Sequence, residues 1–262
     1  MGKNRNENFP VASLLLPSRF RRPIALIYRF AREADDVADE GDLPAPARLA
    51  QLGQFREQLS KIERGVPPDI AWFAALAAVI REHDLPVSAF ADLLSAFAQD
   101  VTQKRYANVT GVLDYCQRSA NPVGRLLLHL FGSTGEANFR WSDSICSALQ
   151  LVNFWQDVAI DYAKGRVYLP QDEMRRCGVT EQHIAGRLCD DAWRTLIRSQ
   201  IDRARGRGIG TVVHHVVHLP AKRIERRDRA APIFRQEQEA VIETRAALRG
   251  FGLTIFVRIH GR

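Results

Sequence analysis

The sequence predicts an all-α protein. Apolar side chains recur at intervals of three and four residues through most of the chain, which is the spacing of one face of a helix. No stretch of any length alternates apolar and polar residues as a half-buried strand does. Prolines and glycines separate the helical patterns, so we expect a series of helices joined by short connections. With 46% hydrophobic and 26% charged residues, the 262-residue chain has the composition of a globular protein.

The first long helix is expected to begin with Pro23 in its first turn, a position that suits proline, and to end close to Asp39. Asp35 and Asp39 are four residues apart, so their carboxylates should share one face of that helix. Acidic side chains at the C-terminal end of a helix oppose its dipole. A cation bound beside the two carboxylates would compensate for this unfavourable electrostatic interaction.

Four further helical patterns follow, over residues 49–62, 70–83, 86–100 and 113–130. The pattern over 49–62 is predicted to be core, and the helices over 70–83 and 86–100 are expected to wall an apolar pocket. Aromatic residues at helical spacing are more often core than ligand contacts, so no phenylalanine of these helices is predicted as a site residue. Asn121-Pro122 cannot continue a regular helix, because proline lacks a donor and crowds the preceding turn. We expect a kink there, beside Gly124, where a ligand could approach the backbone.

Residues 150–170 hold a second set of oxygen-bearing side chains. Asn153, Asp157 and Asp161 are four residues apart, which places them on one stripe of a single helix. Apolar residues, Val158 and Ile160 among them, fill the rest of the circumference, so the helix should be largely buried. Two buried carboxylates need a cationic partner, and Mg²⁺ prefers oxygen ligands.

A single Asp-x-x-x-Asp pair is more often an exposed face paired with Lys or Arg. Two such pairs favour a metal site over an exposed, Lys- or Arg-paired face. Two acidic helices that face each other would bind several Mg²⁺ ions and one diphosphate. The sequence therefore favours a metal and diphosphate site between the two acidic helices.

Four motifs occur in order along the chain. They are Glu-Asn-Phe-Pro-Val-Ala-Ser at 7–13, Ala-Asp-Asp-Val-Ala-Asp-Glu-Gly at 34–41, Asp-Tyr-Cys-Gln-Arg-Ser-Ala-Asn-Pro-Val-Gly at 114–124, and the stretch 150–171. With them, the chain resembles the head-to-head prenyl synthases, the squalene and phytoene synthase group, and most closely the bacterial hydroxysqualene synthases of hopanoid biosynthesis. The resemblance covers about residues 7–205. It implies an isoprenoid-synthase helical bundle around a central cavity.

The resemblance also implies roles for individual residues. Tyr115 stands nine residues before Gly124, the spacing of the family's active-site tyrosine; the alternative is a buried tyrosine that donates to a carbonyl. The predicted catalytic residues are Tyr115, Asp35, Asp39, Asp157 and Asp161. The predicted Mg²⁺ ligands are these four aspartates and Asn153. The predicted substrate-binding residues are Phe9, Arg32, Gln150, Gln156 and Arg166.

Within the family, the motifs are most similar to those of enzymes that ionise presqualene diphosphate and capture water to give hydroxysqualene. The alternatives are presqualene diphosphate synthesis from two farnesyl diphosphates and phytoene synthesis from two geranylgeranyl diphosphates. Many relatives carry Arg where this chain has Gln156, and a neutral amide there could position the nucleophilic water. No Gly-x-Gly-x-x-Gly lies between a strand and a helix, so no nicotinamide cofactor is expected.

Charge and cysteine use suggest where the protein acts. Residues 203–262 hold 13 Lys or Arg against 5 Asp or Glu, whereas residues 1–202 hold 24 against 25, so the net charge of +7 belongs to the C-terminal segment. This segment lacks interleaved aromatics, and nucleic-acid binding is not expected. The four cysteines form no Cys-x-x-Cys pair, and Cys116 and Cys146 match buried helix positions, which favours a reducing cytoplasm.

No apolar run reaches the about 20 residues that a membrane-spanning helix needs. Apolar residues at the cavity mouth and the basic C-terminal segment would allow a peripheral contact with the inner membrane surface. Neighbouring enzymes of the same pathway are further partners that the resemblance suggests.

The resemblance ends near Arg205. We therefore divide the chain into a family-like helical domain, 1–205, and an atypical basic segment, 206–262. Two interpretations of this segment stay open, an altered end of the same domain and ordinary divergence within the family. A replaced terminus would remove one wall of the cavity and suggests a different class of function, a non-catalytic isoprenoid-binding subunit. The intact pairs of acids argue against that alternative.

Overall fold

The computed structural model describes residues 17–39 and 41–206. Every regular element in these two ranges is helical, which agrees with the predicted class; the only β pairing there is one isolated bridge between Arg105 and Val167. Among the described helices, none combines the length and apolarity that crossing a bilayer requires. The predictions for Phe9 and for residues 207–262 lie outside the described residues.

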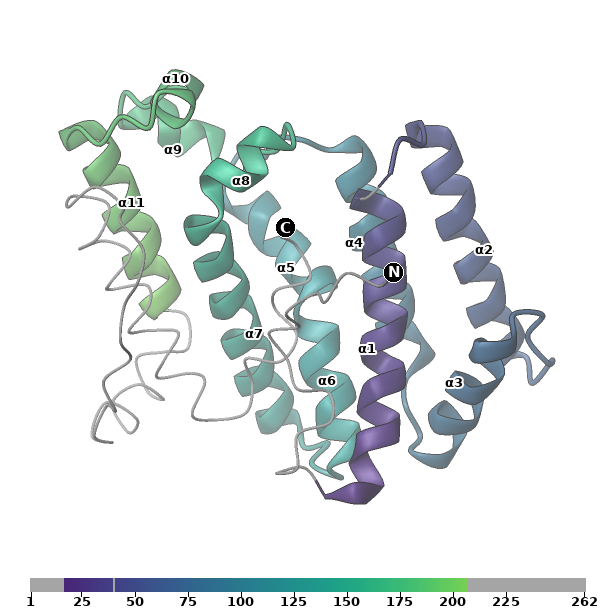
Figure 1. Ribbon diagram of the computed structural model, residues 1–262. Helices are drawn as coiled ribbons and strands as arrows, with labels where there is room; N and C mark the ends of the chain where they lie inside the picture. The colour runs from purple at the N-terminus through teal and green to yellow at the C-terminus, as the bar shows by residue number, and fades with distance from the viewer. Residues whose placement is uncertain (1–16, 40, 207–262) are drawn as a thin grey trace.

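Long helices run side by side along the molecule, and three short ones, α8 to α10, lie at one end of it (Figure 1). The helices are α1 (Ser18–Asp39), α2 (Ala45–Glu63), α3 (Ala71–Glu82), α4 (Val87–Thr102), α5 (Val109–Ser119), α6 (Asn121–Leu130), α7 (Glu136–Gln156), α8 (Val158–Ala163), α9 (Gln171–Arg176), α10 (Glu181–Ala185) and α11 (Asp191–Ala204).

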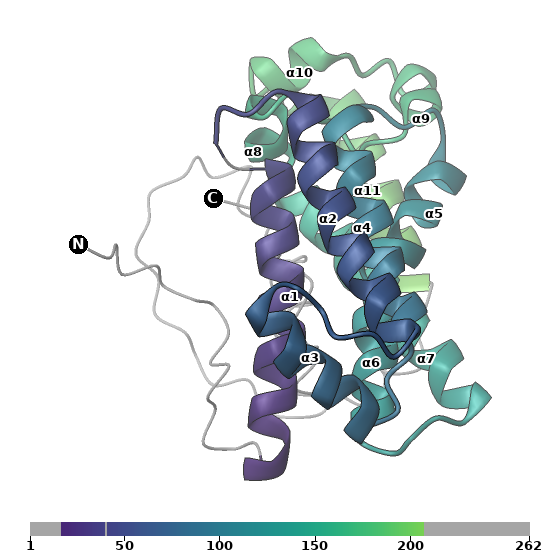
Figure 2. The same cartoon turned by 90° about the vertical axis from the view of Figure 1, so that its right-hand side faces the viewer.

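A first group of buried residues, the apolar cluster, joins α1 to α2, α3, α4 and α6. Phe30 of α1 lies at its centre and makes edge-to-face contacts with Phe73 and Phe90, whose ring centroids are 6.0 and 5.1 Å away. Figure 2 shows α3 beside α1, on the outer side of this cluster. The fully buried members are aliphatic or phenylalanine side chains, so burial of apolar area is what holds these helices together.

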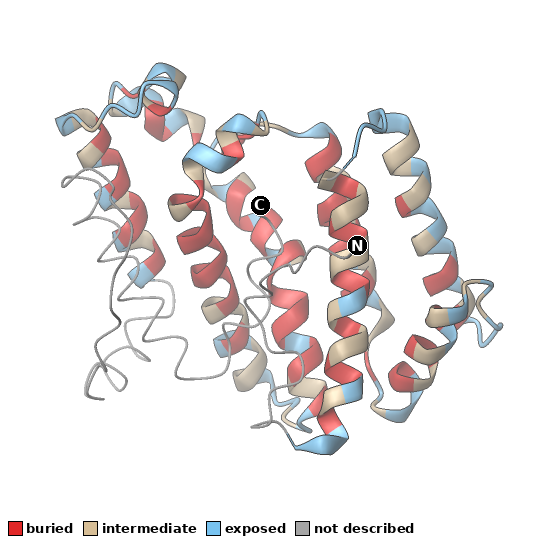
Figure 3. Cartoon of the chain, viewed as in Figure 1, coloured by how far each residue is buried: buried red, intermediate tan, exposed pale blue. Residues whose placement is uncertain are grey.

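A second group, the tyrosine cluster, joins α5 and α7 to α11 and to the segments around α9. It contains the buried rings of Tyr106, Tyr115 and Tyr168, together with Phe154 and Trp193. In Figure 3 the inner helices are mostly red, whereas α8 and the outer face of α2 are pale blue. The tyrosines bring hydroxyl groups into the interior, and each of these needs a hydrogen-bond partner.

The first helix begins earlier than its sequence suggests. It starts at Ser18, so Pro23 lies inside α1 and not in its first turn, and the predicted start was wrong. A proline there removes one hydrogen bond near the helix N-terminus. Phe20, Ile24 and Ile27 of this part of α1 are buried, and we attribute the extension of the helix through the proline to their packing.

The predicted interruption at Asn121-Pro122 is present. α5 ends at Ser119 and α6 begins at Asn121, with proline in its first turn. Gly124, however, faces α7: a Cβ there would lie 2.6 Å from Cys146 Sγ and closer still to Ser142 Oγ. The glycine therefore allows α6 and α7 to approach each other, and the expectation that this face opens to a ligand was wrong.

Candidate active site

The C-terminal end of α1 carries the first acidic pair. Asp35 is only 2% exposed, and the carboxylate of Asp39 is also buried. Arg48 of α2 donates from Nη1 to the carbonyl oxygen of Ala38 at 2.6 Å and from Nη2 to that of Gly41 at 2.5 Å. These bonds satisfy carbonyl groups at and beyond the helix end and place a positive charge against the negative end of the helix dipole. No local sequence pattern predicted this role of Arg48.

The second acidic stripe does not lie on one continuous helix. α7 ends at Gln156, and Asp157 links it to the short helix α8. The amide of Asp157 still donates to the carbonyl of Asn153 at 2.9 Å, and that of Asp161 donates to Asp157 at 2.8 Å. This four-residue bonding keeps the helical rise through the break, and all three side chains are buried. Ile160, predicted to be buried, is 41% exposed, because α8 lies at the surface.

A tight turn after α8 brings Arg166 back towards the acids. Gly165, with a φ of +78°, ends the helix in the left-handed conformation, its amide donating to Tyr162 and that of Arg166 to Asp161, both at 2.8 Å. This is the Schellman arrangement, for which glycine is the favoured residue. Lys164, Gly165 and Arg166 thus form a tight turn.

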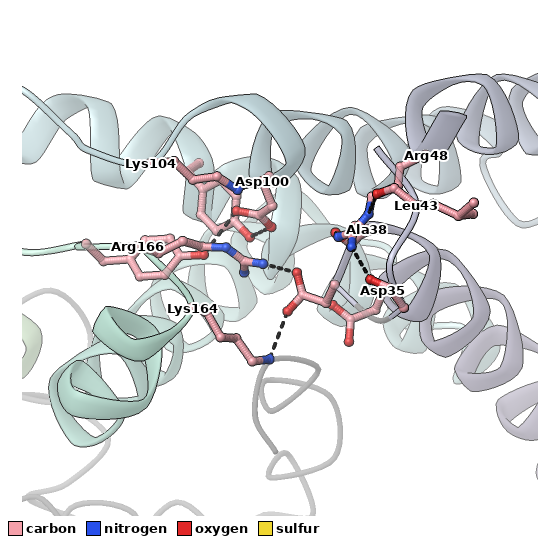
Figure 4. Close-up of polar contacts among 12 residues, drawn as sticks. Asp35, Ala38, Leu43, Arg48, Asp100, Lys104, Lys164 and Arg166 are labelled. Atoms are coloured by element: carbon pink, nitrogen blue, oxygen red, sulfur yellow. Dashed lines mark hydrogen bonds and ion pairs between the residues drawn. The ribbon is translucent and has the colours of Figure 1, made fainter. Parts of the chain in front are cut away.

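Asp39 of α1 binds the two cations of this turn. Arg166 Nη2 donates to Asp39 Oδ1, and Lys164 Nζ lies 3.2 Å from Asp39 Oδ2, as Figure 4 shows. The residues of the arginine pair are 127 positions apart in the chain. The contact therefore joins the end of α1 to the turn that follows the second acidic segment. That the two pairs of acids face each other across a metal and diphosphate site stays a prediction.

Arg166 retains hydrogen-bonding capacity. Its side chain is 5% exposed, and within the part of the chain that the structure describes its Nε and Nη1 atoms are buried without a hydrogen-bond partner. Burial by itself lowers the pKa of the guanidinium, but Tyr168, Asp100 and Asp39 together raise that pKa above its ordinary value. The group is charged at neutral pH, and two unpaired buried donors are suited to an anionic ligand.

Tyr115 is fully buried and donates to Asp100 Oδ2 at 2.5 Å. Tyr168 donates to the other oxygen of the same carboxylate at 3.0 Å. Burial, followed by the charge of Asp100, holds the pKa of Tyr115 well above its usual range, so its hydroxyl stays protonated. The hydroxyl of Tyr115 therefore donates to a carboxylate. The non-catalytic alternative considered from the sequence was a tyrosine that donates to a carbonyl group. A catalytic role for Tyr115 stays a prediction.

Asp100 is a candidate functional residue that sequence reasoning did not select. Its side chain is fully buried, near the end of α4. The available signal was its position three residues after Phe97, on the same inward face of the helix. An acid on an otherwise apolar face indicates a buried partner.

The remaining predicted residues occupy different settings. Gln150 of α7 is buried, and Gln156 is half-buried at the end of that helix. Arg32 is partly exposed and pairs with Asp36 at 2.8 Å and more distantly with Asp35 at 3.7 Å. Their substrate contacts stay predictions.

The described residues contain no group of three or more His, Cys, Asp or Glu side chains arranged to hold a metal ion. The donor chemistry nevertheless fits Mg²⁺. Asp35, Asp157 and Asp161 present buried carboxylate oxygens, and Asn153 adds an amide oxygen. Mg²⁺ typically binds one or two carboxylates and completes its shell with water and substrate phosphate. The residues present are compatible with such a site.

A family model for squalene/phytoene synthase matches residues 3–207. The chain belongs to the squalene/phytoene synthase family. The crystal structure of squalene synthase HpnC from Alicyclobacillus acidocaldarius is similar to it with a TM-score of 0.73 and 30% identity, over 94% of this chain and 88% of that one. This likeness confirms the predicted helical fold.

Curated relatives are similar over part of their length. The hydroxysqualene synthase of Rhodopseudomonas palustris is 39% identical over 184 residues, 69% of this chain and 61% of the relative. That of Zymomonas mobilis is 38% identical over 180 residues, 68% of this chain and 59% of the relative. The phytoene synthase of Mycobacterium tuberculosis is 32% identical over 200 residues, 75% of this chain and 65% of the relative. The chain thus spans about three fifths of the hydroxysqualene synthases it matches.

Proposed function

We propose that the protein ionises presqualene diphosphate and captures water to form hydroxysqualene and diphosphate. The observation that carries the proposal is Arg166, a buried, charged guanidinium that joins the two acidic segments and keeps two donors for an anion. Similarity to hydroxysqualene synthases supports this choice of substrate. The similarity to phytoene synthases supports the alternative, condensation of two prenyl diphosphates.

In the proposed reaction the C–O bond to the diphosphate breaks, and its electron pair leaves with the diphosphate oxygen. Water then adds to the carbocation and loses a proton, so that one water is consumed and one diphosphate released. Asp35, Asp39, Asn153, Asp157 and Asp161 would hold Mg²⁺, which when bound supplies positive charge to the leaving oxygens. Arg166 and Lys164 pair with Asp39 in the structure, and Arg166 would offer its Nε and Nη1 donors to the diphosphate.

The apolar interior protects such a carbocation from uncontrolled hydrolysis. Water must nevertheless reach it once, and we assign its placement to Gln156, whose amide can both accept and donate. A Gln156→Arg variant should release less hydroxysqualene. If this variant forms only hydroxysqualene at the wild-type rate, Gln156 does not position the water.

The test is incubation of the purified chain with Mg²⁺ and presqualene diphosphate, and separately with farnesyl diphosphate, without NADPH. Lipids are then extracted and identified by mass spectrometry. Hydroxysqualene from presqualene diphosphate supports the proposal, and presqualene diphosphate from farnesyl diphosphate would support the condensing alternative instead. If substrate binds but neither product forms, the chain is a binding subunit.

Two variants test whether any product comes from the acidic site. Asp161→Asn should lower the rate by at least about 100-fold, because a proposed Mg²⁺ ligand loses its charge. Asp143→Asn is a matched control on α7: this carboxylate pairs with Arg125, away from the site. It should keep the wild-type rate.

A further inference from the structure

The segment that carries Arg166 is attached to the end of α4 by three hydrogen bonds. The amide of Val167 donates to the carbonyl of Lys104 at 2.9 Å. Arg105 Nη1 donates to the carbonyl of Gly165 at 2.5 Å, and the hydroxyl of Tyr168 donates to Asp100 at 3.0 Å. The first two bonds secure the backbone on either side of Arg166. The third secures a side chain two residues beyond it.

The Tyr168 ring is closely packed. It stacks on Phe154 with centroids 3.9 Å apart and planes 9° apart, and on Tyr106 at 5.5 Å and 22°. Rings stacked in this way restrict tilting but not sliding of the ring in its own plane. The hydrogen bond to Asp100 is directional and fixes the hydroxyl end. Figure 4 shows Asp100 and Arg166 on the same side of the acidic end of α1.

We propose that Asp100 is a positioning residue: by accepting a hydrogen bond from Tyr168, it fixes the segment that holds Arg166, so that Nε and Nη1 face the diphosphate. The ligand named here rests on the proposed function. Asp100 itself need not touch the substrate. It acts through Tyr168, while its second oxygen accepts from Tyr115.

The first test needs no ligand and uses hydrogen–deuterium exchange of the full chain, read on peptides that contain residues 163–170. Tyr168→Phe removes the hydroxyl and keeps the stacked ring. Tyr106→Phe is the matched control, since Tyr106 is also buried and stacks on the same ring, but its hydroxyl accepts from the side-chain amide of Gln99, whereas the hydroxyl of Tyr168 donates to Asp100. We expect exchange in this segment to be about tenfold faster in Tyr168→Phe than in the wild type, and unchanged in Tyr106→Phe.

Asp100→Asn is a second, nearly isosteric variant that removes the charge but retains one accepting oxygen. It should speed exchange in the same segment, to a smaller extent than Tyr168→Phe. If Tyr168→Phe and Asp100→Asn both exchange like the Tyr106→Phe control, the inference is overturned, whatever the protein binds.

The second test measures binding of inorganic diphosphate with Mg²⁺ by calorimetry. Tyr168→Phe should weaken binding about tenfold, and Tyr106→Phe should not. Because Tyr168 acts through Arg166, its substitution should cost nothing further in an Arg166→Ala background. A full tenfold loss in that background would overturn the positioning role. Circular dichroism and thermal melts confirm that each variant is folded.

The two proposals fail separately. A chain that leaves presqualene diphosphate unchanged, yet shows faster exchange in Tyr168→Phe, refutes the proposed reaction and retains the role of Asp100. A chain that makes hydroxysqualene but shows no difference in exchange among the variants retains the reaction and refutes the role of Asp100.

Discussion

The apolar cluster and the tyrosine cluster are held together in different ways. Phe30, in the first, packs against the rings of Phe73 and Phe90, and its contribution depends on buried area and shape. Asp100, in the second, is a buried carboxylate whose two oxygens accept from two tyrosines. Buried polar groups are costly unless every one is paired. The first cluster can therefore tolerate hydrophobic exchange, while the second requires particular residues.

The acidic site lies at the boundary between the two clusters. α1 belongs to the apolar cluster and carries Asp35 and Asp39, whereas α7 belongs to the tyrosine cluster and leads to Asp157. Arg166 and Lys164 link the two across Asp39. The site thus combines acids on a helix of the apolar cluster with acids that follow a helix of the tyrosine cluster.

The largest expected effect is in the apolar cluster. Phe30→Ala should lower the free energy of unfolding by about 3–5 kcal/mol, because it leaves a cavity among buried rings. Binding of diphosphate per folded molecule should stay unchanged. Denaturant titration measures the first quantity and calorimetry the second. Trp141→Ala, at a ring that is 65% exposed, is the control and should change stability by about 0.5 kcal/mol or less. Loss of binding in folded Phe30→Ala would contradict the division of roles.

In the tyrosine cluster, Tyr115→Phe should cost about 1–3 kcal/mol, because Asp100 loses one of its buried donors. Tyr106→Phe should cost less, since the amide of Gln99 that loses its acceptor is only partly buried. Denaturant titration of both variants gives the comparison. Equal losses would show that the carboxylate partner is not what distinguishes the two tyrosines.

At the seam between the clusters, Gly124→Ala should destabilise the protein by about 1–3 kcal/mol, because its Cβ would overlap Ser142 and Cys146 of α7. Gly53→Ala, in α2 with no atom within 4 Å of the added Cβ, should instead be stabilising by about 0.5–1 kcal/mol. Thermal melts distinguish the two signs. A stabilised Gly124→Ala variant would mean that the two helices do not pack as closely as described.

The smallest effect concerns the outer side of the tyrosine cluster, where Arg203 binds Glu173 through both guanidinium ends at 2.5 and 3.0 Å. Burial raises the pKa of Glu173, but the hydrogen bonds from Arg203 and Gln200 outweigh it and bring the pKa below 4.5. A depressed folded-state pKa stabilises the protein above about pH 4.5, and this contribution is lost as pH falls through the lowered value.

The wild type should therefore lose about 1 kcal/mol more than Glu173→Gln between pH 6 and pH 3, measured by denaturant titration at each pH. Glu136→Gln is a control, since this carboxylate is exposed at the start of α7 and pairs with Arg140 one turn along the same helix. Parallel pH profiles for the wild type and Glu173→Gln would show that this ion pair does not contribute to stability over this pH range.

Much of the fold was accessible from local patterns. Helical spacing predicted an all-α chain, and the buried settings of Cys116 and Cys146 were foreseen correctly. The boundaries were less accurate: the start of α1 lies before Pro23, and Asp157 divides a helix expected to be continuous. Packing decides such details, because a favourable buried face can extend a helix through a proline.

The sequence by itself determined the helical class, the four-residue spacing of the acids and the glycine turn before Arg166, because each depends on residues close together in the chain. Only the tertiary structure decided that Arg166 and Lys164 pair with Asp39, that Arg48 binds the end of α1, and that Asp100 receives two tyrosine hydroxyls. These contacts join residues far apart in the sequence. Their partners are chosen by how the helices pack, and helical periodicity carries no record of that choice.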